Sequence, residues 1–251
     1  MIRDLGPFTP RRAHKLDTAI LAMLLNGVHD RHKGRVFVLQ VGSGTGETGL
    51  PFLQRFRDDG WSGLLIEPQP VSFARLEDVH AASERVAVLN LGISDVPATL
   101  PLYSLAPEAE ARSRRGLRRR ASLIRDRIAP AGTPDDLLIT TEVPFLRLDT
   151  VLQELGVKAA QLVAINAGGH EAQVLQSFDL AALAPSLVLV HPTQGTSSED
   201  DCIAQLTAAN LLPFRVADWL VGLAPDRLSI PLEELLTFFR KGLGAPQDDE
   251  E

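Results

Sequence analysis

Residues 36–46, Val-Phe-Val-Leu-Gln-Val-Gly-Ser-Gly-Thr-Gly, constrain the fold of this 251-residue chain more than any other stretch. The apolar run predicts a buried strand. The glycines that follow let the backbone turn tightly and leave no side chain between the main chain and a ligand. A helix is predicted to follow from Glu47, and its first N–H groups would be available to a ligand. This junction is typical of a site for a nucleotide-like cofactor.

A second short apolar strand, predicted at 63–67, ends in an acid, Glu67. A carboxylate at the tip of the second strand can accept hydrogen bonds from both hydroxyls of a ribose. The glycine spacing is G-x-G-x-G, one residue tighter than the G-x-G-x-x-G of a dinucleotide site. The tighter loop and the terminal acid together favour S-adenosylmethionine over a dinucleotide.

Strand and helix patterns alternate from Arg35 onward, which is typical of a parallel, doubly wound sheet. We predict strands at 36–41, 63–67, 86–91, 98–102, 138–146, 161–166, 187–190 and 213–217. Helices are predicted at 10–29, 47–59, 71–82, from 148 with Asp149 as its N-cap, and at 169–178, 199–209 and 231–240. The expected fold is α/β, with a doubly wound and mostly parallel central sheet over 35–243. An N-terminal helical extension (1–34), an Arg-rich helical insertion (about 104–136) and a disordered acidic tail (244–251) complete it.

Bulk properties restrict the partners. The net charge of −7 argues against a general nucleic-acid surface. No apolar run approaches the roughly 20 residues that span a bilayer, and residues 1–4 lack the basic start of a signal peptide. Cys202 is the single cysteine, so an intramolecular disulfide is impossible and a cysteine-based zinc site is not expected. We therefore expect a cytoplasmic protein without a membrane, nucleic-acid or metal partner.

Five blocks, in order from about residue 35 to 192, resemble motifs of the FkbM family of S-adenosylmethionine-dependent methyltransferases. They are the glycine loop with Thr48-Gly49 (V-G-A-N-x-G-x-T-G in the family), 65–70 (E-P-x-P), 90–94 (N-x-A-I-S/A), 143–150 (V-P-x-x-x-L-D-x-L) and 165–175 (I-D-x-E-G-x-E/D-x-x-V/I-L). The resemblance implies the Rossmann-like class I methyltransferase fold. It also implies that S-adenosylmethionine is bound by Gln40, Gly42, Ser43, Gly44, Gly46, Glu67, Pro68, Ser94 and Asn166.

The chain departs from these motifs where the family carries acids after the fourth main strand, because Asn166 and Gly168 stand there. Asn166 could bind the methionine tail or a substrate hydroxyl through its amide, or it could cap the following helix. Gln40 stands where many class I methyltransferases have an acid, and its carbonyl oxygen could still bind the cofactor's ammonium group. The cofactor blocks are intact, whereas the block for chemistry is altered.

Methyl transfer to oxygen needs an aligned nucleophile, and a base if the hydroxyl must lose its proton. His170 and His191 lie near predicted strand ends, and imidazole titrates in the right range. We take these histidines and Glu171 as catalytic candidates, with structural or surface roles as the alternative. A metal site is disfavoured because the adjacent side chains of His170 and Glu171 would point in different directions.

Eight arginines form the Arg-rich segment: Arg112, Arg114, Arg115, Arg118, Arg119, Arg120, Arg125 and Arg127. One interpretation is a solvated helix whose apolar face (Leu117, Leu123, Ile124 and Ile128) packs on the core. The other is a lid that binds a phosphate or carboxylate of the substrate.

The leading hypothesis is an O-methyltransferase for a hydroxyl of a small molecule, a sugar or a natural-product intermediate, with an acceptor that could be anionic. A cofactor-binding but catalytically silent homologue, serving as a regulatory or assembly subunit, is the alternative, and the loss of both acids supports it. A nicotinamide-dependent oxidoreductase is disfavoured by the glycine spacing. A homodimer is compatible with either leading hypothesis.

Overall fold

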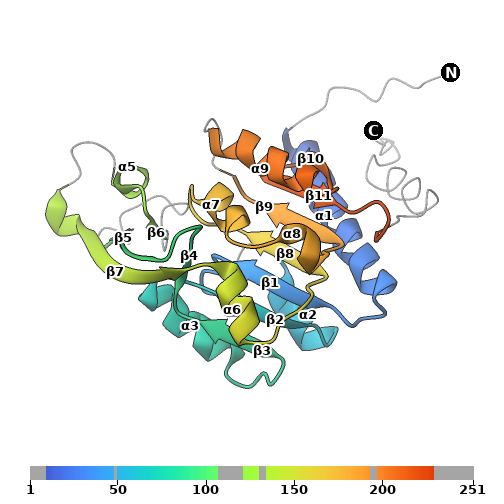
Figure 1. Cartoon of the computed structure of the whole chain (residues 1–251), viewed down its shortest axis with the longest axis horizontal. Helices are drawn as coiled ribbons and strands as arrows, with labels where there is room; N and C mark the ends of the chain where they lie inside the picture. Colours follow the sequence, from blue (N-terminus) through green and yellow to red (C-terminus); the bar gives the residue numbers. More distant parts are fainter. Residues whose placement is uncertain (1–9, 48–49, 107–120, 130–133, 193–196, 229–251) are drawn as a thin grey trace, which may run out of the picture.

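The computed structural model describes residues 10–47, 50–106, 121–129, 134–192 and 197–228 (Figure 1). Its central sheet has seven strands in the order β10-β11-β9-β8-β1-β2-β3. The parallel strands are β1 (Phe37–Val41), β2 (Ser62–Ile66), β3 (Val86–Leu89), β8 (Leu162–Ile165) and β9 (Leu187–Val190). The predicted doubly wound, mostly parallel α/β sheet is thereby confirmed.

One strand of the central sheet was missed by the sequence prediction and makes the sheet mixed. β11 (Trp219–Leu223) runs antiparallel to both β9 and β10 (Leu212–Val216). Only Ala217 and Asp218 separate β10 from β11, and Ala217 has a φ of 52°. A two-residue connection of this kind folds the chain into a hairpin, so the strand that follows must run backwards.

Helices cover both faces of the central sheet, and each face has its own core (Figure 1). On one face lie α1 (Pro10–Arg31), α2 (Phe52–Asp58) and α3 (Pro70–His80). On the other lie α6 (Leu148–Glu154), α7 (Glu171–Gln176), α8 (Leu180–Leu183) and α9 (Ser197–Ala208). Side chains alternate along a strand, and strands covered on both faces are apolar throughout. This explains why β8 and β9 are buried at every position.

One predicted helix start and one predicted N-cap are wrong. α2 begins at Phe52 and not at Glu47, because Pro51 disfavours helical geometry at the residue before it. α6 begins at Leu148 with Arg147 at its N-cap position, and no side chain caps it. Asp149 therefore lies inside the first turn, where it accepts a hydrogen bond of 2.7 Å from the backbone N–H of Thr150 and pairs with Arg147. The helix predicted at 231–240 lies outside the described residues.

A second, four-stranded sheet is inserted between β3 and α6, in the order β4-β7-β5-β6. Its strands are β4 (Gly92–Ile93), β5 (Ala98–Leu105), β6 (Ala121–Ser122) and β7 (Leu138–Leu146), and the short helix α5 (Arg125–Ile128) follows β6. The strands predicted at 98–102 and 138–146 thus pair with each other, from Ala98 opposite Phe145 to Leu105 opposite Leu138. Figure 1 shows β5 and β7 extending to the left, away from the central sheet.

The strand order of the central sheet reverses at β1: β2 and β3 follow on one side of it, and β8 and β9 lie on the other. In open α/β sheets, ligands bind beyond the carboxyl ends of the strands at such a switch point. Here these ends carry Gly42 and Asn166, which lie so close that a Cβ on Gly42 would be 1.9 Å from the Asn166 carbonyl oxygen. The fold therefore places the cofactor junction predicted from the sequence at the topological switch point.

Candidate functional site

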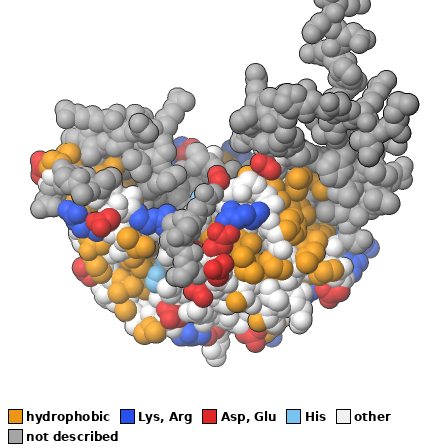
Figure 2. All heavy atoms as spheres, turned by 90° about the horizontal axis from the view of Figure 1, so that it is seen from above, with side chains coloured by type: hydrophobic (Ala, Val, Ile, Leu, Met, Phe, Trp, Pro, Cys, Tyr) orange, Lys and Arg blue, Asp and Glu red, His pale blue; other side chains and the backbone are white. Residues whose placement is uncertain are grey.

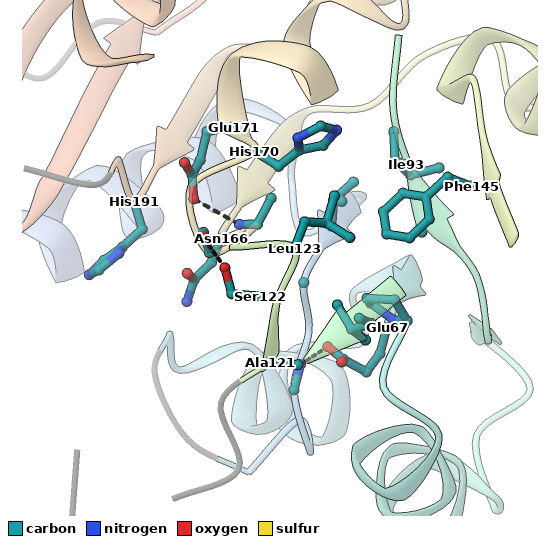
Figure 3. Close-up of a pocket in the computed structure, with 18 of the residues that line it drawn as sticks. Glu67, Ile93, Ala121, Ser122, Leu123, Phe145, Asn166, His170, Glu171 and His191 are labelled. Carbon is teal, nitrogen blue, oxygen red and sulfur yellow. Dashed lines mark hydrogen bonds between the residues drawn. The ribbon is translucent and has the colours of Figure 1, made fainter. Parts of the chain in front are cut away.

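A cavity of about 340 Å³ lies at the switch point, between the central sheet and the second sheet (Figure 3). The central sheet and its loops contribute Val41, Gly42, Gly44, Glu67, Pro68, Asn166, Ala167, Gly168, His170, Glu171 and His191. The second sheet and the chain up to α5 contribute Gly92, Ile93, Leu102, Ala121, Ser122, Leu123, Arg127, Ile128 and Phe145. Its volume falls in the range of small-molecule and cofactor sites.

The three glycines of the loop all have positive φ, but they meet different surroundings. Gly42 has no room for a Cβ against the backbone of Asn166, and a Cβ on Gly46 would lie 2.7 Å from Leu76 and 3.3 Å from Nε2 of His80. A Cβ on Gly44 would meet no atom within 4 Å. Gly44 lines the cavity, so it is the glycine that leaves space for a ligand. Gly46, expected to bind the cofactor, packs against α3 and does not line the cavity.

Two other residues expected in the cofactor site do not line the cavity. Gln40 is on β1, where side chains alternate, and its neighbour Val41 is the one that reaches the wall. Ser43 is buried, and its hydroxyl donates a long hydrogen bond of 3.4 Å to the backbone oxygen of Gln40. Neither residue lines the cavity, which a motif match alone could not show.

Glu67 lies at the tip of β2 with only 6% of its surface exposed. Its Oε2 accepts a hydrogen bond of 2.7 Å from the N–H of Gly44, and its Oε1 accepts one of 3.0 Å from Gln69. The amide of Asn90 donates to the backbone oxygens of Glu67 (2.8 Å) and Pro68 (3.2 Å) and so fixes this tip. Burial raises the pKa of Glu67 to about 7, although the two backbone hydrogen bonds oppose the rise. The carboxyl group is therefore poised between its two protonation states near neutral pH.

Ser94, which was expected to bind the cofactor, does not line the cavity, and its hydroxyl contacts His170. Its hydroxyl lies 3.0 Å from Nε2 of His170 and 3.0 Å from Oδ1 of Asp95. The His170 ring lines the cavity and meets Phe145 edge-on, with 6.2 Å between centroids. Burial lowers the pKa of His170, and the Asp95 charge partly opposes that shift. The imidazole is therefore held in its neutral form at neutral pH.

The loop after β8 is organised by Glu171, whose side chain is fully buried. Its carboxylate accepts hydrogen bonds from the N–H groups of Ala167 (3.1 Å) and Gly169 (3.0 and 3.2 Å). Figure 3 draws one hydrogen bond of the Glu171 carboxylate as a dashed line. Such bonds hold the backbone that carries Asn166 and His170. The structure thus gives this acid a role in holding the loop, and the catalytic role suggested by the sequence stays a prediction.

Asn166 and His191 both line the cavity. Asn166 is exposed and is not the cap of α7, because His170 occupies the N-cap position and no side chain caps that helix. The helix-cap interpretation of Asn166 is therefore wrong. His191 is half-buried, with its ring edge-on to Trp219 at 5.1 Å. Trp219 was not a candidate from the sequence, because β11, the strand that carries it, was not predicted.

Gly168, where the family has an acid, lies directly under strand β6. Its φ is 63°, and a Cβ there would lie 2.9 Å from the backbone oxygen of Ala121. The hydroxyl of Ser122 donates a hydrogen bond of 2.9 Å to the Gly168 oxygen (Figure 3). The position of the missing acid is thus filled by another segment of the chain.

Most of the Arg-rich segment, Arg112 to Arg120 together with Leu117, lies outside the described residues. Its described end forms β6 and the four-residue helix α5, in which Arg127 lines the cavity and Arg125 does not. Of its apolar residues, Leu123 and Ile128 reach the cavity wall, whereas Ile124 is 47% exposed. On the face seen in Figure 2, basic, acidic and hydrophobic side chains are mixed over the described surface.

Within the described residues, no group of three or more His, Cys, Asp or Glu side chains is arranged to hold a metal ion. A search of the same residues finds no helix with the length and apolar character needed to cross a membrane.

Comparison with known proteins adds a family assignment. No curated protein sequence matches the chain. Among solved structures, an FkbM methyltransferase from Methylobacillus flagellatus KT is 12% identical, with a TM-score of 0.47 over 75% of this chain and 43% of that one. The present chain therefore spans less than half of the length of that protein. A precorrin-6y C5,15-methyltransferase from Geobacter metallireducens GS-15 is 12% identical, with a TM-score of 0.41 over 78% of this chain and 72% of that one. Fibrillarin from Aeropyrum pernix, solved with natively bound S-adenosyl-L-methionine, is 8% identical, with a TM-score of 0.39 over 79% of this chain and 74% of that one.

The family assignment rests on the sequence match and not on these distant structural likenesses. The methyltransferase FkbM domain matches residues 40–211, well over half of the chain. This range includes every residue that lines the cavity and leaves out the N-terminal helix α1. The match includes the glycine loop, Glu67, the second sheet and the loop after β8. This chain therefore belongs to the FkbM family of methyltransferases.

Proposed function

We propose that the chain is an S-adenosylmethionine-dependent O-methyltransferase of the cytoplasm that acts on a hydroxyl group of a small molecule, a sugar or a natural product. The observation that carries the proposal is the junction of Gly44 and Glu67. A Cβ on Gly44 would meet no atom within 4 Å, and the Gly44 N–H donates to the buried carboxylate of Glu67 at the end of β2. Gly44, Glu67, Pro68 and Asn166 would hold the cofactor, which supplies a methyl group on a positively charged sulfur when bound.

The second sheet supplies the side of the cavity that suits an acceptor. Its contribution is mostly apolar, from Ile93, Leu102, Leu123, Ile128 and Phe145. Such a wall excludes water from the reacting groups, and Arg127 adds one positive charge to it. These features support an acceptor with an apolar body, and an anionic group on it would be placed near Arg127.

The chain offers two imidazoles to the cavity as bases, from His170 and His191. His170 is the better candidate, because the Ser94 hydroxyl orients its ring through Nε2 at 3.0 Å and a neutral imidazole can take up a hydroxyl proton. Most of the catalytic effect would come from positioning, since methyl transfer requires alignment of the acceptor oxygen with the methyl group.

The test begins with calorimetric titration of the full chain with S-adenosylmethionine and S-adenosylhomocysteine, followed by turnover assays with a panel of hydroxylated acceptors. Saturable binding of both cofactor forms and methylation of one acceptor class are expected. Failure to bind either form would overturn the proposal. Tight binding without turnover on any acceptor would favour the silent homologue, a candidate supported by the closed position at Gly168.

Once an acceptor is found, Arg127→Ala tests the acceptor side of the site. We expect KM for an anionic acceptor to rise at least about fivefold, roughly 1 kcal/mol, with cofactor affinity unchanged. Arg125→Ala is the matched control, because Arg125 is on the same short helix but does not line the cavity. An equal effect of the two variants would show that α5 acts through general charge and not through contact.

A further inference from the structure

We propose that Ser94 and Asp95 are positioning residues that fix the tautomer of His170, so that Nδ1 of its imidazole is the proton acceptor of the site. The inference rests on the proposed methyltransferase function for its catalytic meaning. The arrangement itself can be tested without turnover.

The tautomer follows from a count of protons. A serine hydroxyl has one hydrogen to donate, whereas an ionised carboxylate has none. The contact of 3.0 Å between Ser94 Oγ and Asp95 Oδ1 therefore uses the serine hydrogen. Ser94 Oγ can then only accept at its other contact, 3.0 Å from Nε2 of His170, so Nε2 carries a hydrogen. In a neutral imidazole with this hydrogen, the lone pair is on Nδ1.

Nδ1 has no hydrogen-bond partner among the residues that the structure describes, and the His170 ring lines the cavity. This nitrogen is therefore available to a ligand. As the acceptor oxygen forms its bond to the methyl carbon and the methyl–sulfur bond breaks with its electron pair on sulfur, the hydroxyl proton passes to Nδ1. The imidazolium formed is stabilised by the Ser94 hydroxyl and, through it, by the Asp95 carboxylate.

The support of His170 is rigid because it comes from the second sheet. Ser94 is 4% exposed, and its N–H donates to the backbone oxygen of Leu146 (2.9 Å) at the end of β7. The backbone oxygen of Asp95 accepts a hydrogen bond of 2.7 Å from Nη1 of Arg147. The neighbouring strand β7 also places the Phe145 ring edge-on to the imidazole. β4 and β7 thus hold a side chain that belongs to the start of α7.

Few charges act on the imidazole. Asp95, from the segment after β4, raises the pKa of His170, while burial lowers it more strongly. The Glu171 carboxylate, next to it on α7, is bound to the amides of Ala167 and Gly169. The Arg147 guanidinium is paired with Asp149 and bound to the Asp95 backbone. Neutralising Asp95 should therefore lower the pKa of His170 further.

The direct test is long-range proton–nitrogen NMR on the ¹⁵N-labelled full chain at pH 8, where the imidazole is neutral, with the signals of His170 assigned by His170→Gln. We expect a single tautomer with hydrogen on Nε2. Ser94→Ala should give a mixture of tautomers, and Ser94→Thr, which retains the hydroxyl, should restore the single form. Asp95→Asn should lower the midpoint of the His170 titration. An unchanged single tautomer in Ser94→Ala would overturn the proposal, and Asp95→Asn provides an independent test if Ser94→Ala does not fold.

Activity gives the second readout. Ser94→Ala should lower kcat at least about tenfold with an unchanged Kd for S-adenosylmethionine, and Asp95→Asn should move the lower limb of the kcat–pH profile to lower pH. Glu199→Gln is the control, because its ion pair with Arg215 joins α9 to β10 and neither residue lines the cavity. An Nε2–H tautomer that depends on Ser94, without cofactor binding, would overturn the methyltransferase proposal and leave the positioning role intact. Cofactor binding and turnover with no change in kcat or pH profile would overturn the positioning role alone.

Discussion

At the scale of single residues, the glycine loop shows that one motif can combine different physical requirements. Gly42 and Gly46 lack side chains because other parts of the chain occupy the space. Gly44 has the same sign of φ, at 58°, but faces open space at the cavity wall. The backbone strain of a substitution and the loss of a ligand can therefore be separated at this position.

Gly44→Ala is expected to weaken S-adenosylmethionine binding at least about tenfold, or roughly 1.4 kcal/mol, because its methyl group would enter the cavity. Calorimetry measures the affinity. Gly60→Ala is the matched control, since Gly60 also has a positive φ (71°) with open space around it but does not line the cavity. Both variants should lose about 1–2 kcal/mol of unfolding free energy to left-handed strain. Equal affinities would show that the loop does not contact the cofactor.

Glu67 gives a prediction about pH. Its pKa is raised from 4.5 to about 7 in the folded chain, so its contribution to stability is fully present below pH 4.5 and is lost as pH rises through about 7. The shift corresponds to about 3 kcal/mol. Glu67→Gln should remove this component. Urea unfolding at pH 5 and pH 8 measures it, and Glu154→Gln, an exposed acid on α6, should retain the wild-type pH dependence.

The same carboxyl group should link cofactor binding to proton release, because ribose hydroxyls donate to the ionised form. We expect wild-type affinity to rise with pH between about 6 and 8, and the calorimetric heat to depend on the ionisation enthalpy of the buffer. At pH 8, Glu67→Gln should bind at least about tenfold more weakly, whereas near pH 5.5 the two proteins should be similar. A constant ratio at both pH values would contradict ribose binding by the ionised acid.

At the scale of elements, the decisive feature is the contact of β6 with the loop after β8. β6 contains only two residues, Ala121 and Ser122, yet it closes the space over Gly168. The Ser122 hydroxyl donates to the Gly168 oxygen and accepts a hydrogen bond of 3.0 Å from the N–H of Ile124. One side chain thus ties the second sheet to the central sheet at the cavity.

Ser122→Ala should therefore loosen this contact while leaving the central sheet intact. We expect faster amide exchange at Ile124, with a loss of about 1 kcal/mol in unfolding free energy, the usual value for one hydrogen bond. Hydrogen-exchange mass spectrometry measures the first quantity. Ser62→Ala is the control, because its hydroxyl bonds to the Val36 oxygen in the distant β2–β1 region. Unchanged exchange in 121–128 would show that the side chain does not hold β6.

At the scale of the whole molecule, the switch point between β1 and β8 determines where the cavity lies. The N–H of Asn166 donates a hydrogen bond of 2.9 Å to the Val41 oxygen, and Gly42 follows at once with its backbone against that of Asn166. Both Gly42 and Asn166 line the cavity, which therefore lies directly beyond this contact.

Gly42→Ala is expected to destabilise the whole fold by about 3 kcal/mol or more, since a 1.9 Å contact with backbone atoms cannot be relieved by a rotamer change. Gly156→Ala is the control: its φ is 67° and its surroundings are open, so only the strain of about 1–2 kcal/mol is expected. Thermal and urea unfolding measure both. Similar losses in the two variants would contradict the close approach of β1 and β8.

Much of the fold could be predicted from the sequence because the pattern of apolar residues within each strand is local. The runs at 138–146 and 187–190 have the bounds of β7 and β9. β9 is buried at every position, and apolar strands covered on both faces are continuous in sequence. β11 was missed because its direction depends on a two-residue hairpin and on pairing with β9. The second sheet could not be assigned either, since periodicity shows that strands exist but not which strands pair.

The sequence by itself determined the α/β alternation, the glycine loop and the acid at the tip of β2, because each depends on residues that are neighbours in the chain. Only the tertiary structure decided that Gly44 faces the cavity while Gln40 does not, and that β6 occupies the space at Gly168. It likewise brought Ser94 to His170 across 76 positions of sequence. Contacts over such separations follow from the way the two sheets pack, and no local pattern in the chain encodes that packing.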